Sequence, residues 1–344
     1  MRPPLGVLDQ CPVPEGGDPE GAVAASLALA EAAEDLGYRR YWVAEHHNTP
    51  SLGCASPVVL LAAAAARTHT IRLGSGGVLL PYASPLAVAE DFRLLAALAP
   101  GRVDLGVGRA AGADPAAEAA LHHRHDGSVP EDFDERLVDL VALLDDAPLP
   151  TGHPLLGVRA APMPAAGAGV TGPEVWVLGS STRGASRAAY LGLPFAFAHF
   201  ITDRFGAQVV RSYRRGFTPR PPSRAGPRAA VAVSVVCAPT AGRAEGLAAS
   251  LDLWWLRRGA AERGPLLGPE EATAELARLD DLERARVAEH RASVVVGDPA
   301  TAVERLAAVA RDLDADEVLV LTNCHDPTDR LRSYELLAHH WARA

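Results

Sequence analysis

The sequence predicts an α/β protein, namely a (β/α)8 TIM barrel with insertions that forms one domain over residues 1–344. Short apolar runs begin near residues 5, 40, 71 and 102, so a unit of about thirty residues repeats. Each run is followed by a longer stretch with apolar residues at helical spacing. Eight strand–helix pairs can be counted in this way, and such alternation is typical of a parallel sheet.

The expected elements follow one another along the chain. Strands are expected at residues 5–9, 40–46, 71–80, 102–108, 174–179, 194–200, 229–237 and 317–322. Helices are expected at residues 19–37, 56–68, 84–98, 130–145, 182–191, 203–216, 240–258, 299–313 and 330–341. Gly37 stands where a helix C-cap belongs, and Ser84 followed by Pro85 would begin the third helix.

Two stretches interrupt the alternation. Residues 147–173 are rich in proline, glycine and alanine, and we interpret them as an irregular insertion. Residues 259–297 are charged and less regular, so we expect a partly helical excursion or a lid over the active site. The alternative architecture is a doubly wound sheet of eight strands, because the same alternation would also build one.

The charge balance narrows the possible classes of function. The formal net charge is −9 and no basic block appears, which argues against nucleic acid and anionic membranes as partners. The chain contains no lysine, which excludes a Schiff base with pyridoxal phosphate and a Walker A loop. Any phosphate would therefore be held by arginine, hydroxyl groups and the backbone N–H groups at helix starts.

Cysteine spacing and the beginning of the chain bear on metal sites and location. The four cysteines form no CxxC pair, which argues against structural zinc and a disulfide framework. The opening MRPPLGVLDQ has no charged segment followed by an apolar one, and LLAAAAA at 60–66 is too short to span a bilayer. A cytoplasmic location is the resulting expectation.

Polar residues follow the expected strands at their carboxyl ends, where a barrel places its active site. They are Asp9, Gln10, Glu45, His46, His47, Asn48, Ser75, Arg109, Ser180, Ser181, Thr182, His199, Thr322 and Asn323. Because they come from segments far apart in the sequence and gather on one rim, they favour an enzyme.

A phosphate site is predicted after the fifth strand. Gly179, Ser180 and Ser181 stand between a strand and a helix start, where N–H groups and the helix dipole favour an anion. Arg109, from the end of the fourth strand, could neutralise a phosphate from across the rim. The alternative is that this segment is only a helix N-cap.

The segment EHHN at 45–48 offers an acid–base group. His46 could donate a proton or stabilise a developing anion near neutral pH. Adjacent residues of an extended chain point in opposite directions, so one of His46 and His47 is expected to face the pocket. Both could instead be structural. A metal site with His199 or Glu45 is a further alternative, but HxH and HExxH spacings are missing and we expect no metal.

Two other motifs have a functional and a structural interpretation. Gly76 and Gly77 interrupt a strand, which indicates a bulge or the close approach of a ligand such as a flat ring. The alternative is a bulge that only curves the barrel. The cluster HHRH at 122–125 could suggest a metal site, but we interpret it as a solvated loop.

Four segments together resemble the luciferase-like monooxygenase family, in its branch of single-chain group 1 oxidoreductases. These segments are RYWVAEHHNTPSLGCASP, IRLGSGGVLLPYASPLAVAEDFRLL, PGRVDLGVGRAAGADP and VWVLGSSTRGASRAAYLGLPFAFAHF. The likeness covers nearly the whole chain. The order of the EHH, GSGG, GRVDLGVGR and LGSS blocks makes it specific.

This resemblance implies a (β/α)8 barrel that binds FMN in its reduced form, FMNH2, supplied by a separate flavin reductase. With O2 the reduced flavin would oxygenate a small organic substrate, in some members within natural-product biosynthesis. His46 matches the family's active-site histidine beside the isoalloxazine ring, and Gly76-Gly77 matches a bulge with a non-prolyl cis peptide bond. Arg109 and Ser180 match phosphate-binding positions. A homodimer is also implied.

The sequence departs from the family pattern at some positions. Arg183 and Gly184 stand where tyrosine and serine are common, and Arg183 could replace the lost hydroxyl as a phosphate ligand. Gly108 stands where the luciferase α subunit has a reactive cysteine, so that thiol chemistry is absent. An F420-dependent oxidoreductase is an alternative within the family, although the EHH and GSGG blocks favour FMN. A non-catalytic flavin-binding protein is a third hypothesis, which the retained EHH disfavours.

Overall fold

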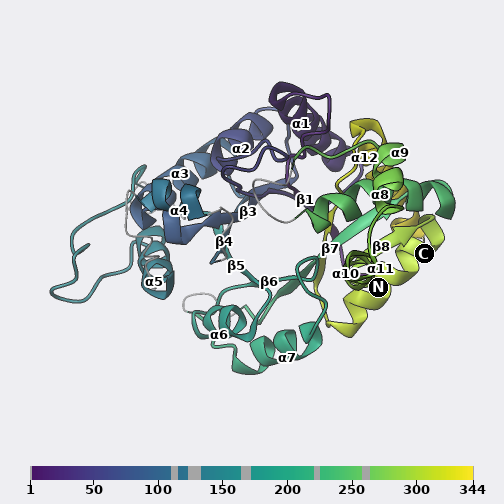
Figure 1. Ribbon diagram of the computed structural model, residues 1–344. Helices are drawn as coiled ribbons and strands as arrows, with labels where there is room; N and C mark the ends of the chain where they lie inside the picture. Colours follow the sequence, from purple (N-terminus) through teal and green to yellow (C-terminus); the bar gives the residue numbers. More distant parts are fainter. Residues whose placement is uncertain are drawn as a thin grey trace.

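Eight parallel strands close into a barrel that helices surround (Figure 1). The computed structural model describes residues 2–109, 115–122, 133–163, 172–220, 225–257 and 264–343. The strands are β1 (Leu5–Asp9), β2 (Arg40–Val43), β3 (Arg72–Leu79), β4 (Val103–Gly108), β5 (Glu174–Gly179), β6 (Phe195–Ala198), β7 (Ala229–Cys237), β8 (Val294–Gly297) and β9 (Glu317–Leu321). Pairing follows the order β6-β5-β4-β3-β2-β1-β9-β7, and β6 also pairs with β7. That last pairing closes the ring, so the predicted barrel is confirmed and the doubly wound sheet is wrong.

The helices fill the connections between the strands. They are α1 (Pro19–Asp35), α2 (Pro57–Ala65), α3 (Pro85–Leu98), α4 (Pro115–His122), α5 (Phe133–Leu144), α6 (Thr182–Tyr190), α7 (Gly206–Gly216), α8 (Ala241–Leu256), α9 (Pro269–Leu276), α10 (Asp281–Arg291), α11 (Pro299–Asp312) and α12 (Pro327–Arg343), with a short 3-10 turn η1 (Leu80–Tyr82). Gly37 has a φ of 79°, as a helix C-cap requires. Among these described helices, none is both long and apolar enough to cross a membrane.

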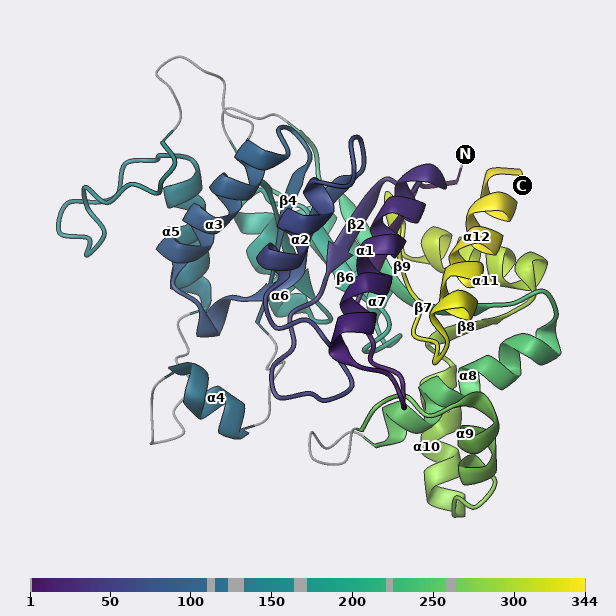
Figure 2. The same ribbon diagram turned by 90° about the horizontal axis from the view of Figure 1, so that it is seen from above.

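The stretch 259–297 is more regular than the sequence analysis predicts. Its described part holds α9, α10 and the unpredicted strand β8, which pairs with the carboxyl half of β7 from Ser234 to Cys237. β8 lies outside the ring, so β9 is the eighth strand of the barrel. Helices α9 and α10 pack against α8 beside the barrel (Figure 2). The short apolar run at 294–296 is the signal that could have identified β8.

Two further segments differ in how well they were predicted. The helix α4 was not predicted, and it ends at His122, the first residue of the HHRH cluster. The other three residues of that cluster lie outside the described residues. Within the described parts of 147–173 the chain forms no helix or strand, as its composition predicts.

Apolar packing occurs on both faces of the barrel wall. The larger core lies between strands and helices, and a smaller set packs inside the ring: Leu8, Trp42, Ala44, Trp176, Ala196, Ala230, Ala232, Leu319 and Leu321. Ala44, Ala196 and Ala232 of this set line a cavity at the carboxyl ends of the strands. Trp42 also lines it, and its ring meets that of Trp176 edge to face at a centroid distance of 5.4 Å.

A buried charge network fills the amino end of the barrel, opposite the predicted site. Arg40 donates to Asp104 at 2.6 Å and makes a two-pronged bond to Glu317, with Nη2 to Oε2 at 2.9 Å. Its guanidinium also lies over the Trp176 ring at 4.7 Å. Burial acts to lower the pKa of Arg40, but Asp104 and Glu317 raise it above its usual value, so the side chain stays charged.

Glu34 joins α1 to the loop before β3. Its carboxylate accepts hydrogen bonds from the backbone N–H groups of His69 and Ile71 at 2.9 and 2.8 Å, and from both the N–H and the hydroxyl of Thr70. Burial acts to raise the pKa of Glu34, but the backbone bonds from Ile71, Thr70 and His69 lower it to about 2. The ionised form therefore stabilises the folded chain.

The pH dependence of stability tests this contribution. The folded pKa of Glu34 lies below its usual 4.5, so its stabilisation is present above that pH and is lost as the pH falls toward 2. We expect Glu34→Gln to lower the melting temperature at pH 7 by about 1–3 °C. The difference from the native protein should shrink in thermal unfolding between pH 5 and pH 2. A difference in melting temperature that stays constant over this pH range would contradict the stabilising role of ionised Glu34. An equal effect of Glu31→Gln, on the same helix, would contradict it as well.

Candidate active site

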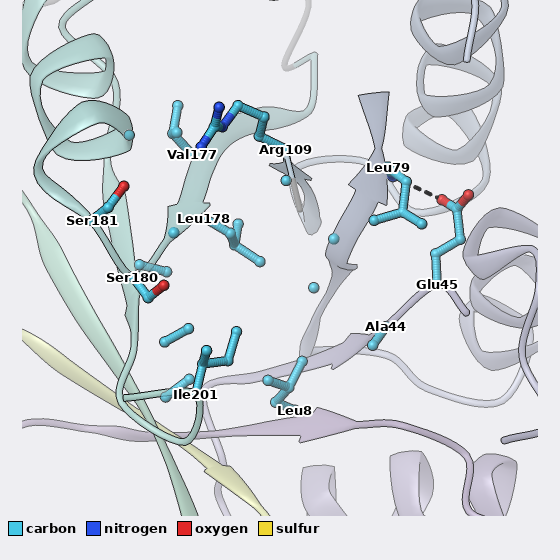
Figure 3. A pocket seen from close by; sticks show the side chains of 18 of the residues that line it. Leu8, Ala44, Glu45, Leu79, Arg109, Val177, Leu178, Ser180, Ser181 and Ile201 are labelled. Atoms are coloured by element: carbon cyan, nitrogen blue, oxygen red, sulfur yellow. Dashed lines mark hydrogen bonds between the residues drawn. The ribbon is translucent and has the colours of Figure 1, made fainter. Parts of the chain in front are cut away.

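A cavity of about 290 Å³ lies at the carboxyl ends of the barrel strands (Figure 3). All nine residues predicted for the site line it: His46, Gly76, Gly77, Arg109, Gly179, Ser180, Ser181, Arg183 and Gly184. They come from the ends of four strands and from the start of α6. Their roles toward a cofactor stay predictions, but the structure brings the whole set to one place.

The start of α6 forms one wall of the cavity. Ser181 is its N-cap residue, and the Ser181 side chain makes no capping hydrogen bond. The first N–H groups of the helix have no intrahelical acceptor, so they and the two serine hydroxyls remain available to an anion. Figure 3 shows Ser180 and Ser181 on the wall opposite Glu45 and Leu79. We call this wall, together with Arg109, Arg183 and Arg187, the cationic wall.

Two charged residues at this wall, Arg187 within it and Asp134 beside it, were not predicted from the sequence. Arg187 lies one helical turn after Arg183 and forms an ion pair with Asp134 of α5, while Arg183 lies 4.0 Å from the same carboxylate. The spacing of the two arginines on α6 was a usable signal for Arg187. Asp134 carried no such signal, because it reaches the cavity from a distant helix. Three guanidinium groups against one carboxylate leave the cationic wall with a surplus of two positive charges.

Gly76 and Gly77 form the predicted bulge. The register between β3 and β4 shifts between Gly76 and Val78, and the peptide bond between the two glycines is cis, as the family resemblance implies. A Cβ at Gly77 would lie 2.7 Å from the carbonyl oxygen of Gly106, a backbone atom, whereas one at Gly76 would first meet the end of the Leu8 side chain. The barrel wall therefore requires glycine at position 77, whatever occupies the cavity, and disfavours a side chain at position 76.

The segment after β2 places one of its two histidines in the cavity. His46 lines the cavity and His47 does not, so the prediction that one of them faces the pocket is confirmed. The ring nitrogen Nε2 of His47 lies 2.8 Å from Glu45 Oε1, and the other Glu45 oxygen accepts from the Leu79 N–H at 3.0 Å. Glu45 thus ties β2 to the end of β3. The backbone N–H of His46 donates to the Cys54 carbonyl at 3.0 Å, which fixes its place.

The metal alternative finds no support in the geometry. His199 is buried next to β6 but does not line the cavity, and burial lowers its pKa against the opposing effect of Asp203. Within the described part of the chain, His, Cys, Asp and Glu side chains form no group of three or more that could hold a metal ion.

The segment expected as a lid stands clear of the cavity as far as the structure describes it. Residues 264–297 contribute nothing to the cavity lining, and Leu266 instead pairs with Val13 and Glu15 in the loop after β1. Residues 258–263 and the loop at 110–114 after Arg109 lie outside the described residues. Gly108 lines the cavity, and a Cβ there would point into open space.

Sequence comparisons agree with this architecture. Residues 4–317 match the luciferase-like monooxygenase family. The chain is 43% identical over 343 residues to the uncharacterized protein YwcH of Bacillus subtilis, covering 98% of this chain and 99% of that one. It is 39% identical to a luciferase-like monooxygenase of Escherichia coli K12, covering 96% and 94%. It is 32% identical to an N-acetyl-S-alkylcysteine monooxygenase of B. subtilis, covering 97% of each.

Solved structures give the same result. Apo-MsnO8 superposes with a TM-score of 0.88 at 39% identity, covering 100% of this chain and 98% of that one. Two more distant structures, which share the fold, cover 99% or more of each chain with a TM-score of 0.71. They are the oxygenating constituent of a 3,6-diketocamphane monooxygenase of Pseudomonas putida with FMN, at 20% identity, and an F420-dependent secondary alcohol dehydrogenase, at 15%. The chain belongs to the luciferase-like monooxygenase family, and it is an oxidoreductase.

Proposed function

We propose that the protein is an FMNH2-dependent monooxygenase that oxygenates a small organic substrate with O2. The observation that supports this proposal most directly is that His46 and the cationic wall line the same cavity at the carboxyl end of the barrel. A separate flavin reductase would supply the reduced cofactor, and the family resemblance supports a homodimer. The reductase and the homodimer both stay predictions, and sedimentation of the purified protein tests whether it is a dimer.

The residues present fit a flavin mononucleotide. A phosphate monoester carries about −1.5 to −2 charges at neutral pH, and the cationic wall has a surplus of two positive charges to meet it. Leu8, Leu79, Val177 and Leu178 supply apolar walls on which a flat ring can lie, in the usual pattern of a cofactor pocket. The reduced ring, when bound, activates O2 so that one oxygen atom can pass to the substrate.

The protein's own groups have separable tasks. Arg109, Ser180, Ser181 and the start of α6 would hold the phosphate by charge-assisted hydrogen bonds. Arg183 would take the place of the hydroxyl that other family members have there. His46 would hold or deliver a proton at a ring nitrogen, which an imidazole group can do near neutral pH. The apolar walls would keep water away from the reacting atoms.

The main alternative is an F420-dependent oxidoreductase, because one of the structures that share this fold is an F420-dependent secondary alcohol dehydrogenase. The EHH and GSGG blocks of the sequence favour FMN. Competition of the two cofactors for the purified protein separates the hypotheses. The non-catalytic alternative is disfavoured because His46 faces the cavity, where a protein that only stores flavin has no need of an acid–base group.

Oxygen incorporation tests the reaction. The protein would be mixed with FMN, NADH and a flavin reductase under ¹⁸O2, with a panel of thioethers, ketones and aromatic compounds. An N-acetyl-S-alkylcysteine belongs in the panel, because a relative is named for that substrate. We expect a product that carries one ¹⁸O atom and that requires reduced FMN. Tight FMN binding without an oxygenated product from any member of the panel would count against monooxygenation.

Arg109→Ala tests the phosphate assignment. Among the described residues Arg109 makes no ion pair, so its guanidinium is available for a ligand. We expect the Kd for FMN to rise about 10- to 100-fold, the value of one charge-assisted pair. The Kd for riboflavin, which lacks the phosphate, should not change. The Kd of Arg109→Lys for FMN should lie between the values of the native protein and Arg109→Ala, because lysine keeps the charge but loses the two-pronged geometry.

The control is Arg332→Ala, which removes an exposed arginine of α12 that pairs only locally with Glu335. It should leave both affinities unchanged. An equal loss of FMN and riboflavin binding in Arg109→Ala would mean that the residue shapes the pocket and does not hold a phosphate.

A further inference from the structure

A buried pair of amide side chains stands at the wall of the cavity that lies opposite the phosphate site. Gln10 follows β1 and Asn323 follows β9, and their side chains are joined by a hydrogen bond of 2.7 Å from Asn323 Nδ2 to Gln10 Oε1. Gln10 is only 7% exposed and Asn323 only 1% exposed. Gln10 lines the cavity and Asn323 does not, so Asn323 acts on the cavity only through its neighbour.

This bond decides which end of Gln10 faces the cavity. Because Gln10 Oε1 is used by Asn323, the Nε2 amide group with its two N–H donors remains, and it makes no hydrogen bond to a described residue. The Asn323 Oδ1 atom is buried with no partner among the described residues. The opposite orientation would bury the Asn323 NH2 with two unpaired donors, which proteins avoid more strictly than an unpaired carbonyl.

The topology sets Gln10 across the cavity from the phosphate site. β1 and β5 are four strands apart in a ring of eight, so Gln10 and Ser180 stand on opposite sides. Apolar side chains line the space between them, among them Leu8 and Leu178. With a cofactor phosphate held at β5, Gln10 would stand at the far side of the cavity from that phosphate.

The charged groups around Gln10 are already paired. Asp9 lies beneath it and is buried with Arg330, while the Tyr41 hydroxyl donates to Asp9 at 2.7 Å. Burial acts to raise the pKa of Asp9, but Arg330 and the bond from Tyr41 lower it, so this carboxylate and the guanidinium cancel as an ion pair. Glu45 is held by His47 and the Leu79 N–H. A neutral donor is thus what this wall offers.

We infer that Gln10 is a substrate-binding residue that donates a hydrogen bond to an oxygen acceptor on an otherwise apolar substrate. Asn323 is its positioning residue, which keeps the donor end turned to the cavity. The substrate class is an apolar molecule with a carbonyl or a similar acceptor oxygen. This inference rests on the proposed function, because it takes the β1 side as the substrate side.

Three small probes of similar size test the inference. Acetophenone offers an acceptor oxygen, ethylbenzene offers none, and N-methylaniline offers a donor; their affinities can be measured by saturation-transfer NMR with oxidised FMN present and absent. We expect acetophenone to bind about three- to tenfold tighter than ethylbenzene, the value of one neutral hydrogen bond. Gln10→Leu should reduce this ratio to near one. Gln10→Glu keeps the bond from Asn323 but presents only an acceptor, so it should favour N-methylaniline over acetophenone.

Two further variants separate binding from structure. Asn323→Leu lies outside the cavity lining, yet it should lower the acetophenone-to-ethylbenzene ratio, which a purely structural role would leave unchanged. Gln208→Leu, at an exposed glutamine of α7, is the matched control and should leave the ratio as in the native protein. The Kd for FMN should stay the same in all four variants.

The outcomes distinguish this inference from the proposed function. An unchanged ratio in Gln10→Leu and Gln10→Glu, or no preference for acetophenone in the native protein, overturns the role of Gln10. Absence of detectable binding of the probes counts in the same way. Failure of FMN to bind at all would overturn the proposed function, while the ratio measured without FMN would still decide the role of Gln10.

Discussion

His46→Ala is expected to lower the rate of substrate oxygenation by about 10²- to 10⁴-fold, the usual contribution of a positioned acid–base group. His46 is the one histidine of the EHHN segment that lines the cavity, and its backbone is fixed by the bond to Cys54. Alanine removes the ring nitrogen that would hold or deliver the proton. The phosphate contacts are on the opposite wall, so the Kd for FMN should change less than about threefold.

The measurement is kcat and the Kd for FMN, with the best substrate from the ¹⁸O2 panel. His47→Ala is the matched control, since it removes a neighbouring histidine that does not line the cavity. Glu45 would keep its bond to the Leu79 N–H in this variant, and turnover should stay within about threefold of native. Equal losses in both variants would indicate that the segment acts as a scaffold. Native turnover in His46→Ala would remove the acid–base role.

Most of the barrel could be predicted because its signals are local. Each barrel strand is a short apolar run before a helix, and Gly37 and Ser84 with Pro85 mark helix boundaries that the structure reproduces within a few residues. The strand β8 was not predicted, because it lies in a charged stretch of the sequence and pairs outside the ring. Closure itself has no local signal, since it depends on the pairing of β6 with β7.

The site was predictable to a similar extent and for a related reason. Parallel strands bring their carboxyl ends together, so polar residues at those ends meet on one rim even when they are far apart in sequence. This rule found His46, Arg109 and the serines after β5. It could not find Asp134, which comes from a helix, and it gave no hint that Gln10 is oriented by Asn323. Such pairings depend on side-chain directions that only the folded chain sets.

The charge network at the amino end of the barrel was missed altogether, and it carries the largest expected effect on stability. Its residues stand at or near the starts of strands, Arg40 in β2, Asp104 in β4 and Glu317 in β9, where a barrel gives no expectation of a functional site. Arg40 is 1% exposed and neutralises Asp104 and Glu317, which are almost fully buried. Asp104 keeps Arg72 as a second partner, whereas Glu317 has only the exposed Arg39 at 3.6 Å.

Arg40→Met is therefore expected to lower the free energy of unfolding by about 3–5 kcal/mol, because it leaves a buried carboxylate without its partner. With an unfolding entropy of about 2.1 cal/mol/K per residue, this corresponds to a fall of about 4–7 °C in Tm for a chain of this length. Methionine matches the volume of the arginine stem, so the loss reports charge more than packing. Denaturant and thermal unfolding measure it.

Two further variants show whether the loss of stability comes from the buried charge. Arg39→Met removes the neighbouring arginine, whose side chain is 51% exposed, and should cost no more than about 1 kcal/mol. Adding Glu317→Gln to Arg40→Met removes the stranded carboxylate and should recover part of the loss, so the two substitutions would not be additive. Lowering the pH should also reduce the difference in unfolding free energy between Arg40→Met and the native protein, because protonation of Glu317 in the folded variant removes the uncompensated charge. Equal costs for Arg39→Met and Arg40→Met, or strict additivity with Glu317→Gln, would show that the network contributes through packing and not through charge.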